Sequence, residues 1–97
     1  MTQTERIEHM ERLLDNGKNA LSDLSSALSE YSAALTAIEE LTEYYESSQW
    51  MQDFEDDCDG KIPAGIKRGV LSEDEVYNFL MENGETVEDM KALIEKL

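Results

Sequence analysis

The chain has 97 residues, of which 23 are acidic and 8 are basic, so its formal net charge is −15. This length corresponds to a single domain, 1–97. The negative charge repels phosphate backbones and anionic lipids, so we expect neither nucleic acid nor a membrane as a partner.

Cys58 is the only cysteine, which excludes an internal disulfide. No apolar run approaches the roughly 20 residues that cross a bilayer, and the first residues lack the apolar core of a signal peptide. We therefore expect a soluble, cytoplasmic protein.

Residues 2–46 are predicted to form one long amphipathic helix, because they contain no proline and a single glycine. Thr2 and Glu5 have the spacing of a capping box at a helix start. Apolar side chains then recur in steps of three and four residues, interrupted only at Gly17. This is the heptad period of helices that pack lengthwise on one another. These residues, called the seam below, are Ile7, Met10, Leu14, Leu21, Leu24, Leu28, Tyr31, Leu35 and Ile38.

The two flanks of the seam differ in character when Ile7 is assigned to heptad position a. Position g is mostly apolar, and it holds Arg6, Leu13, Ala20, Ala27, Ala34 and Leu41. Position e is polar, and it holds Glu11, Lys18, Ser25, Ser32 and Glu39. A stripe made of a, d and g is typical of a helix packed in a bundle. The small alanines permit close, antiparallel approach of a second helix.

Gly17 is the one weak point of this helix, since glycine in a helix interior costs about 1 kcal/mol relative to alanine. The seam keeps its phase on both sides of Gly17, which favours one continuous helix. The alternative is a helix that breaks at Gly17 and folds back into a monomeric bundle.

The apolar side of the pattern changes near residue 47. A break there, followed by a short helix over 49–57, explains the change better than a continuous helix does. The break is predicted to bring four aromatic side chains together as core packing, namely Tyr44, Tyr45, Trp50 and Phe54.

Residues 58–71 are predicted to be a loop, because they contain the only proline and three of the five glycines. Ser72 and Glu75 form a second capping-box pattern that opens a helix over 73–83. Asn83-Gly84 is predicted to end this helix, and Thr86 to cap a last helix over 87–97. No segment alternates as a strand does, so the fold class is all-α, a long helix packed with three shorter ones.

Residues 55–60 resemble the first half of a calcium-binding EF-hand loop. Glu55, Asp57 and Asp59 fall at loop positions 1, 3 and 5, and Gly60 falls at the sharp turn. The closing bidentate glutamate at position 12 is missing, which favours a solvated acidic helix end followed by a glycine turn. We therefore assign no metal, no cofactor and no catalytic residue. A cation-responsive regulatory protein that uses this segment is the alternative.

The lengths of the predicted helices favour self-association. A helix of about 43 residues is about 65 Å long, whereas the three later helices total about 48 Å and are separated by turns. Part of the apolar stripe would stay exposed in a monomer, and a homodimer that shares the long helices would cover it.

We expect a non-enzymatic interaction or scaffold protein, either a helical bundle or a coiled-coil dimer. The candidate surface for a further, unknown protein partner comprises Tyr44, Trp50, Phe54, Lys67, Arg68 and Tyr77. A hydrolase of small phosphorylated metabolites, built on Lys67, Arg68 and the acids, is a third hypothesis.

Three stretches carry a resemblance to a known family. They are residues 44–55, YYESSQWMQDFE, residues 60–63, GKIP, and residues 67–77, KRGVLSEDEVY. Together they resemble a family of small bacterial proteins known as domain of unknown function 4298. The resemblance implies a bacterial, cytoplasmic, helical protein, and it brings no activity, cofactor or catalytic residue with it.

Overall fold

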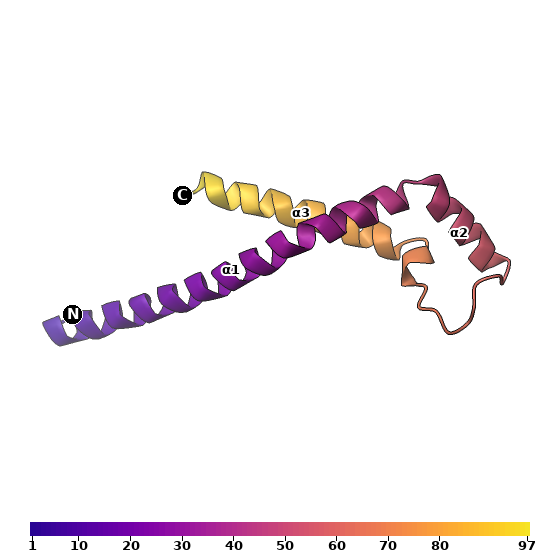
Figure 1. Cartoon of the computed structure of the whole chain (residues 1–97). Helices are drawn as coiled ribbons and strands as arrows, with labels where there is room; N and C mark the ends of the chain where they lie inside the picture. The colour runs from indigo at the N-terminus through magenta and orange to yellow at the C-terminus, as the bar shows by residue number, and fades with distance from the viewer. The chain divides into compact units, whose positions relative to one another are not determined.

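The computed structural model describes residues 1–97, and all of its regular elements are helical (Figure 1). The elements in chain order are α1 (Gln3–Tyr45), α2 (Ser48–Cys58), the 3₁₀ turn η1 (Gly69–Leu71) and α3 (Glu75–Glu95). The all-α prediction is confirmed. None of the helices combines the length and the hydropathy that a bilayer-spanning segment needs.

The chain divides into two compact units, and each is described by itself. The N-terminal unit is Met1–Ile38 and the C-terminal unit is Glu39–Leu97, so the boundary falls inside α1. The N-terminal unit consists of one helix and nothing else, whereas the C-terminal unit contains the last turns of α1 together with α2, η1 and α3.

Helix α1 begins with the predicted capping box. The Glu5 backbone N–H donates to Thr2 Oγ1 at 3.2 Å, and the Thr2 backbone N–H donates to Glu5 Oε1 at 3.4 Å. These bonds satisfy amide donors that the first turn of a helix leaves without partners. The helix continues without a break through Gly17 to Tyr45, which confirms the prediction of one long helix.

The break between α1 and α2 lies where the aromatic pattern predicts it. Ser47 has an extended backbone and is the N-cap of α2. Its hydroxyl accepts from the Trp50 backbone N–H at 3.3 Å and donates to the Tyr44 carbonyl at 2.6 Å. One serine therefore closes the end of α1 and opens α2, and the observed bounds of α2 differ from the predicted 49–57 by one residue at each end.

Helix α2 ends in a Schellman motif. The Lys61 N–H donates to the Asp56 carbonyl at 2.9 Å, and the Gly60 N–H donates to the Asp57 carbonyl at 3.1 Å. Gly60 has a φ of +74°, the left-handed conformation that this motif requires and that residues with a side chain rarely adopt. The Asp59-Gly60 pair is therefore explained by helix termination.

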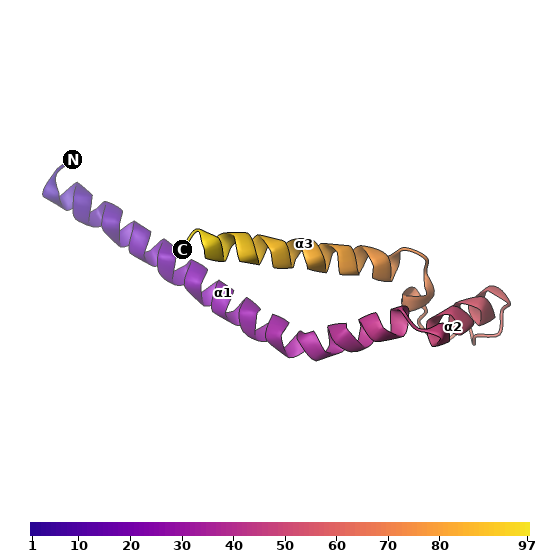
Figure 2. The ribbon, with the colours of Figure 1, turned by 90° about the horizontal axis from the view of Figure 1, so that it is seen from above.

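The C-terminal segment differs from the prediction of two helices over 73–83 and 87–97. The structure has one helix, α3, which Figure 2 shows as an uninterrupted ribbon. Gly84 does not adopt a positive φ, and the Thr86 hydroxyl donates to the Glu82 carbonyl at 2.9 Å from within the helix instead of capping a new one. The helix continues because its apolar residues keep one helical phase across Asn83-Gly84 and outweigh the cost of one glycine, about 1 kcal/mol. These residues are Val76, Leu80, Val87, Met90 and Ile94.

The core is small and lies in the C-terminal unit, where η1 contacts both α2 and α3. Its two buried hydrophobic side chains are Leu71 in η1 and Val76 in the first turn of α3, which are 7% and 4% exposed. Helix α1 contains no buried residue. The fold therefore concentrates its buried side chains around the short turn before α3, and no residue of the long helix reaches the same burial.

Candidate functional site

An aromatic cluster joins the end of α1 to α2 and to η1. Trp50 stacks on Phe54 with ring centroids 5.2 Å apart, and Tyr45 meets Trp50 edge-on at 5.1 Å. The Trp50 indole Nε1–H donates to the Val70 carbonyl at 2.8 Å. The predicted gathering of these rings is confirmed, and their mutual contacts are those of packing.

Tyr44 lies beside this cluster and bonds to α2 through its hydroxyl. The phenol O–H donates to Asp53 Oδ2 at 2.6 Å, while Gln49 Nε2 donates to Asp53 Oδ1 at 3.2 Å. Burial raises the pKa of Tyr44 to about 12, and the hydrogen bond to Asp53 and the negative charge of that carboxylate add to the effect. The phenol is therefore protonated at neutral pH and acts as a hydrogen-bond donor that ties α2 to the end of α1.

The acidic end of α2 is paired with cations of the following loop. Arg68 Nη1 lies 2.8 Å from Asp57 Oδ1, and Lys61 Nζ lies 3.9 Å from Asp56 Oδ1. These pairs are partly exposed, so each contributes about 1 kcal/mol or less. The EF-hand-like spacing is not realised as a loop, because Glu55 and Asp57 lie in α2. No group of three or more His, Cys, Asp or Glu side chains is arranged to hold a metal ion.

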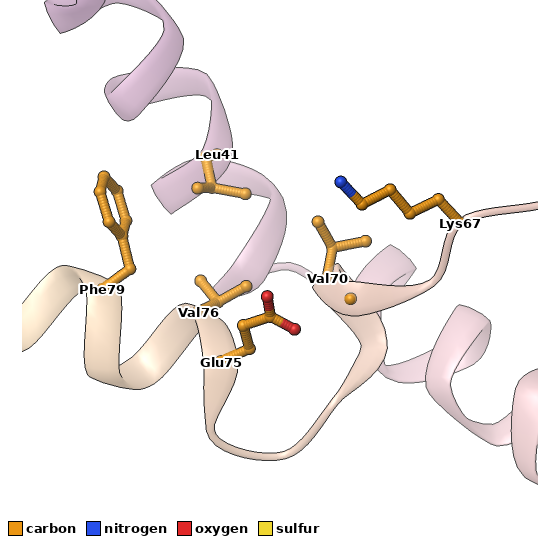
Figure 3. A pocket seen from close by; sticks show the side chains of 7 residues that line it. Leu41, Lys67, Val70, Glu75, Val76 and Phe79 are labelled. Carbon is orange, nitrogen blue, oxygen red and sulfur yellow. The ribbon is translucent and has the colours of Figure 1, made fainter.

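An open groove of about 470 Å³ lies in the C-terminal unit between the last turns of α1, η1 and the start of α3 (Figure 3). Its walls are mostly apolar and come from three elements, whereas its rim carries one cation and one carboxylate. The lining residues are Leu41, Lys67, Gly69, Val70, Glu75, Val76 and Phe79. Figure 3 shows the Lys67 side chain extending from the loop toward Leu41.

The carboxylate on the rim is held against the η1 backbone. The Glu75 N–H donates to Ser72 Oγ at 3.1 Å, the bond expected of the predicted capping pattern, but α3 begins at Glu75 instead of residue 73, and its N-cap is Asp74, which makes no side-chain cap bond. The Glu75 side chain lies over Gly69, where a Cβ would come within 2.8 Å of Glu75 Oε2. A glycine at position 69 therefore allows the carboxylate to approach the turn closely.

Four of the six predicted partner residues make contacts within the C-terminal unit. Trp50 and Phe54 belong to the aromatic cluster, Tyr44 bonds to Asp53, and Arg68 pairs with Asp57. The two others differ: Lys67 lies on the groove rim, and Tyr77 is 53% exposed. Sequence reasoning missed the groove walls, since Leu41 and Val76 stand far apart in the chain and no local pattern pairs them.

The seam of α1 is the second candidate surface. None of its residues is buried, and Ile7, Leu21 and Leu28 are 55%, 67% and 50% exposed. The N-terminal unit has no second element that could cover them. The exposed large seam residues are Ile7, Met10, Leu14, Leu21, Leu24, Leu28 and Leu35. A contiguous apolar face of this kind on a highly charged protein is typical of an interaction surface.

The chain was compared with protein families, curated proteins and solved structures. No curated protein matches it, and no solved structure does. A family model, described as a domain of unknown function (DUF4298), matches residues 7–93. The family expected from the motifs around Trp50 and Lys67 is thus confirmed over nearly the whole chain, and the protein belongs to the DUF4298 family.

Proposed function

We propose that the protein is a non-enzymatic interaction or scaffold protein that self-associates through the seam of α1. The observation that carries the proposal is the exposure of seven large aliphatic seam residues in a unit that has no other element to cover them. Full burial of one such side chain contributes about 1.5–3 kcal/mol, so an exposed seam forfeits a large fraction of the stability of a small domain.

The lengths of the helices support a second chain as the cover. Helix α1 has 43 residues and is about 65 Å long, whereas α3, the longest other helix, has 21 residues and is about 31 Å long. Wherever α3 lies, it spans about half of α1. Only a helix of comparable length covers the whole seam, and a second α1 has both that length and the same heptad period.

The C-terminal unit would then present a surface to a further protein. The apolar groove with Lys67 and Glu75 on its rim and the exposed ring of Tyr77 are the features of this unit that are suited to such a contact. We expect this protein to act in the cytoplasm, a reducing compartment in which an exposed thiol such as that of Cys58 stays reduced.

Self-association is tested by two variants that add the same charge to opposite faces of α1. Leu21→Glu places a carboxylate on the seam, and Ser26→Glu places one on the far face of the helix. Both residues are exposed in the chain, and glutamate is a good helix former, so neither variant should disrupt α1 itself. Sedimentation equilibrium at micromolar concentration then reports the mass of each protein.

The proposal predicts a dimer for the natural chain and for Ser26→Glu, and a weakening of dimerisation by at least tenfold for Leu21→Glu, because a buried unpaired carboxylate opposes association. A mass of 11.0 kDa for all three proteins throughout the concentration range would refute the proposal. Equal dimerisation of the two variants would show that the seam is not the interface.

A further inference from the structure

We propose that α1 pairs with α1 of a second copy in the antiparallel orientation, in the register that sets Leu21 level with Leu24 of the second copy. This inference rests on the proposed self-association and adds the orientation and the register of the pair. Its evidence is threefold: one flank of the seam is apolar and the other polar, Gly17 occupies a seam position, and the seam extends from Ile7 to Ile38.

The residues that flank the seam, at positions g and e, distinguish the two orientations. In a parallel pair of helices, position g of one chain packs beside position e of the other, whereas in an antiparallel pair g packs beside g and e beside e. In α1 the residues at g are apolar except for the first, and they are Arg6, Leu13, Ala20, Ala27, Ala34 and Leu41. The residues at e are polar, and they are Glu11, Lys18, Ser25, Ser32 and Glu39. A parallel pair would place the apolar flank of each helix against the polar flank of the other. An antiparallel pair places apolar against apolar and leaves both polar flanks together at the solvent side.

The layers of the seam give a second, independent argument. In a parallel pair each seam position meets its own copy, so Gly17 would face Gly17 and Tyr31 would face Tyr31. The Gly17 layer would then contain no side chain, and the side chains of the two adjacent layers would lose packing contacts. In the antiparallel register, Gly17 faces Leu28, so the leucine fills the space that the glycine leaves, and Tyr31 faces the smaller Leu14 instead of a second tyrosine. The space is available, since apart from the two neighbouring residues and the adjacent helix backbone no atom lies within 4 Å of the place where a Cβ of residue 17 would stand.

The same register uses the seam from end to end. Ile7 faces Ile38, Met10 faces Leu35 and Leu21 faces Leu24, so every seam residue of the N-terminal unit finds a partner residue. The paired stretch is about 47 Å long, and a helix face about 10 Å wide gives on the order of 500 Å² on each copy. Two such faces total about 1,000 Å², the lower bound for a specific interface between proteins.

The orientation is tested with spin labels on the exposed far face of α1. Cys58→Ser first removes the only native thiol, which is exposed. Arg12→Cys or Ala33→Cys then supplies one labelling site on the full chain, and both positions are exposed. Distances between labels are measured by pulsed electron spin resonance, first on Arg12→Cys alone and then on an equimolar mixture of the two labelled proteins. Circular dichroism checks that the labelled chains remain helical.

The antiparallel register predicts that two labels at position 12 are offset by about 30 Å along the helix axis, since 21 residues separate the two levels. It also predicts that the mixture gains a shorter distance, because position 12 of one copy lies level with position 33 of the other. A parallel pair gives the reverse, a short distance for Arg12→Cys alone and an offset of about 30 Å between positions 12 and 33.

The outcomes separate this inference from the proposed function. A short distance for Arg12→Cys alone would overturn the antiparallel orientation and leave self-association intact. Absence of any distance between labels, together with a monomeric mass in sedimentation, would overturn both and would point to a different protein as the cover of the seam. A dimer in which the mixture gains no shorter distance would contradict the register.

Discussion

The two units of this chain use the same kinds of apolar side chains in different ways. In the C-terminal unit, α2 and α3 both contact η1, Trp50 stacks on Phe54, and Leu71 and Val76 are buried. In the N-terminal unit, the leucines of the seam are arranged as regularly as in any packed helix, and nothing within the unit covers them. The comparison shows that a strong heptad pattern establishes a helix and an apolar face, whereas the pattern alone does not specify what packs on that face.

The stability of the two units should therefore depend differently on protein concentration. The stability of the C-terminal unit should follow its own side-chain contacts and be independent of protein concentration. The stability of the N-terminal helix should rise with protein concentration, because in the proposed dimer a second copy supplies its packing.

Among the substitutions that test this contrast, we expect the largest change in the free energy of unfolding from those at Trp50. Trp50→Ala removes the ring stacked on Phe54 and the bond to the Val70 carbonyl, and we expect it to lower the free energy of unfolding of the C-terminal unit by about 3 kcal/mol. Trp50→Phe keeps a ring and should cost about 1 kcal/mol. Urea unfolding followed by circular dichroism measures both values.

Tyr77→Ala is the matched control for these variants, since it removes an aromatic ring that is 53% exposed. We expect it to change the free energy of unfolding by less than about 0.5 kcal/mol. The comparison between the units predicts in addition that Trp50→Ala still sediments as a dimer. Loss of dimerisation in Trp50→Ala but not in Tyr77→Ala would show that the two units depend on each other.

A smaller and pH-dependent effect is expected from Tyr44. Its pKa is raised from 10.0 to about 12, so the protonated phenol is favoured by folding. The stability that it contributes is fully present below pH 10 and is lost as the pH rises through 12. In an absorbance titration of tyrosinate, one of the four tyrosines should ionise about two pH units late, and Tyr44→Phe should abolish that late step. A titration with no late step in the natural chain would contradict the bond to Asp53.

Much of the fold was predictable because it is encoded by residues close together in the chain. The Thr2 and Ser47 caps, the continuity of α1 and the turn at Gly60 depend on neighbours within a few positions. The prediction of a break at Asn83-Gly84 was wrong because a local turn signal was weighed above the helical phase that Val76 and Val87 share. Local signals decide a helix end only where the apolar pattern also stops.

The candidate surfaces were only partly predictable. The seam of α1 follows from its period alone. The groove needs Leu41, Val70 and Phe79 to meet, and their separation in the chain leaves no local sign of that meeting. Similarly, the sequence does not distinguish the roles of the adjacent cations Lys67 and Arg68. The structure pairs Arg68 with Asp57 and places Lys67 on the groove rim.

The central claim, that a second copy covers the seam of α1, is tested most directly by hydrogen exchange at two protein concentrations. The account predicts that amides between Ile7 and Ile38 exchange slowly in the concentrated sample and faster on dilution, while amides around Leu71 and Val76 are unaffected. Exchange in the Ile7–Ile38 segment that is equally fast, or equally slow, at every concentration would contradict it.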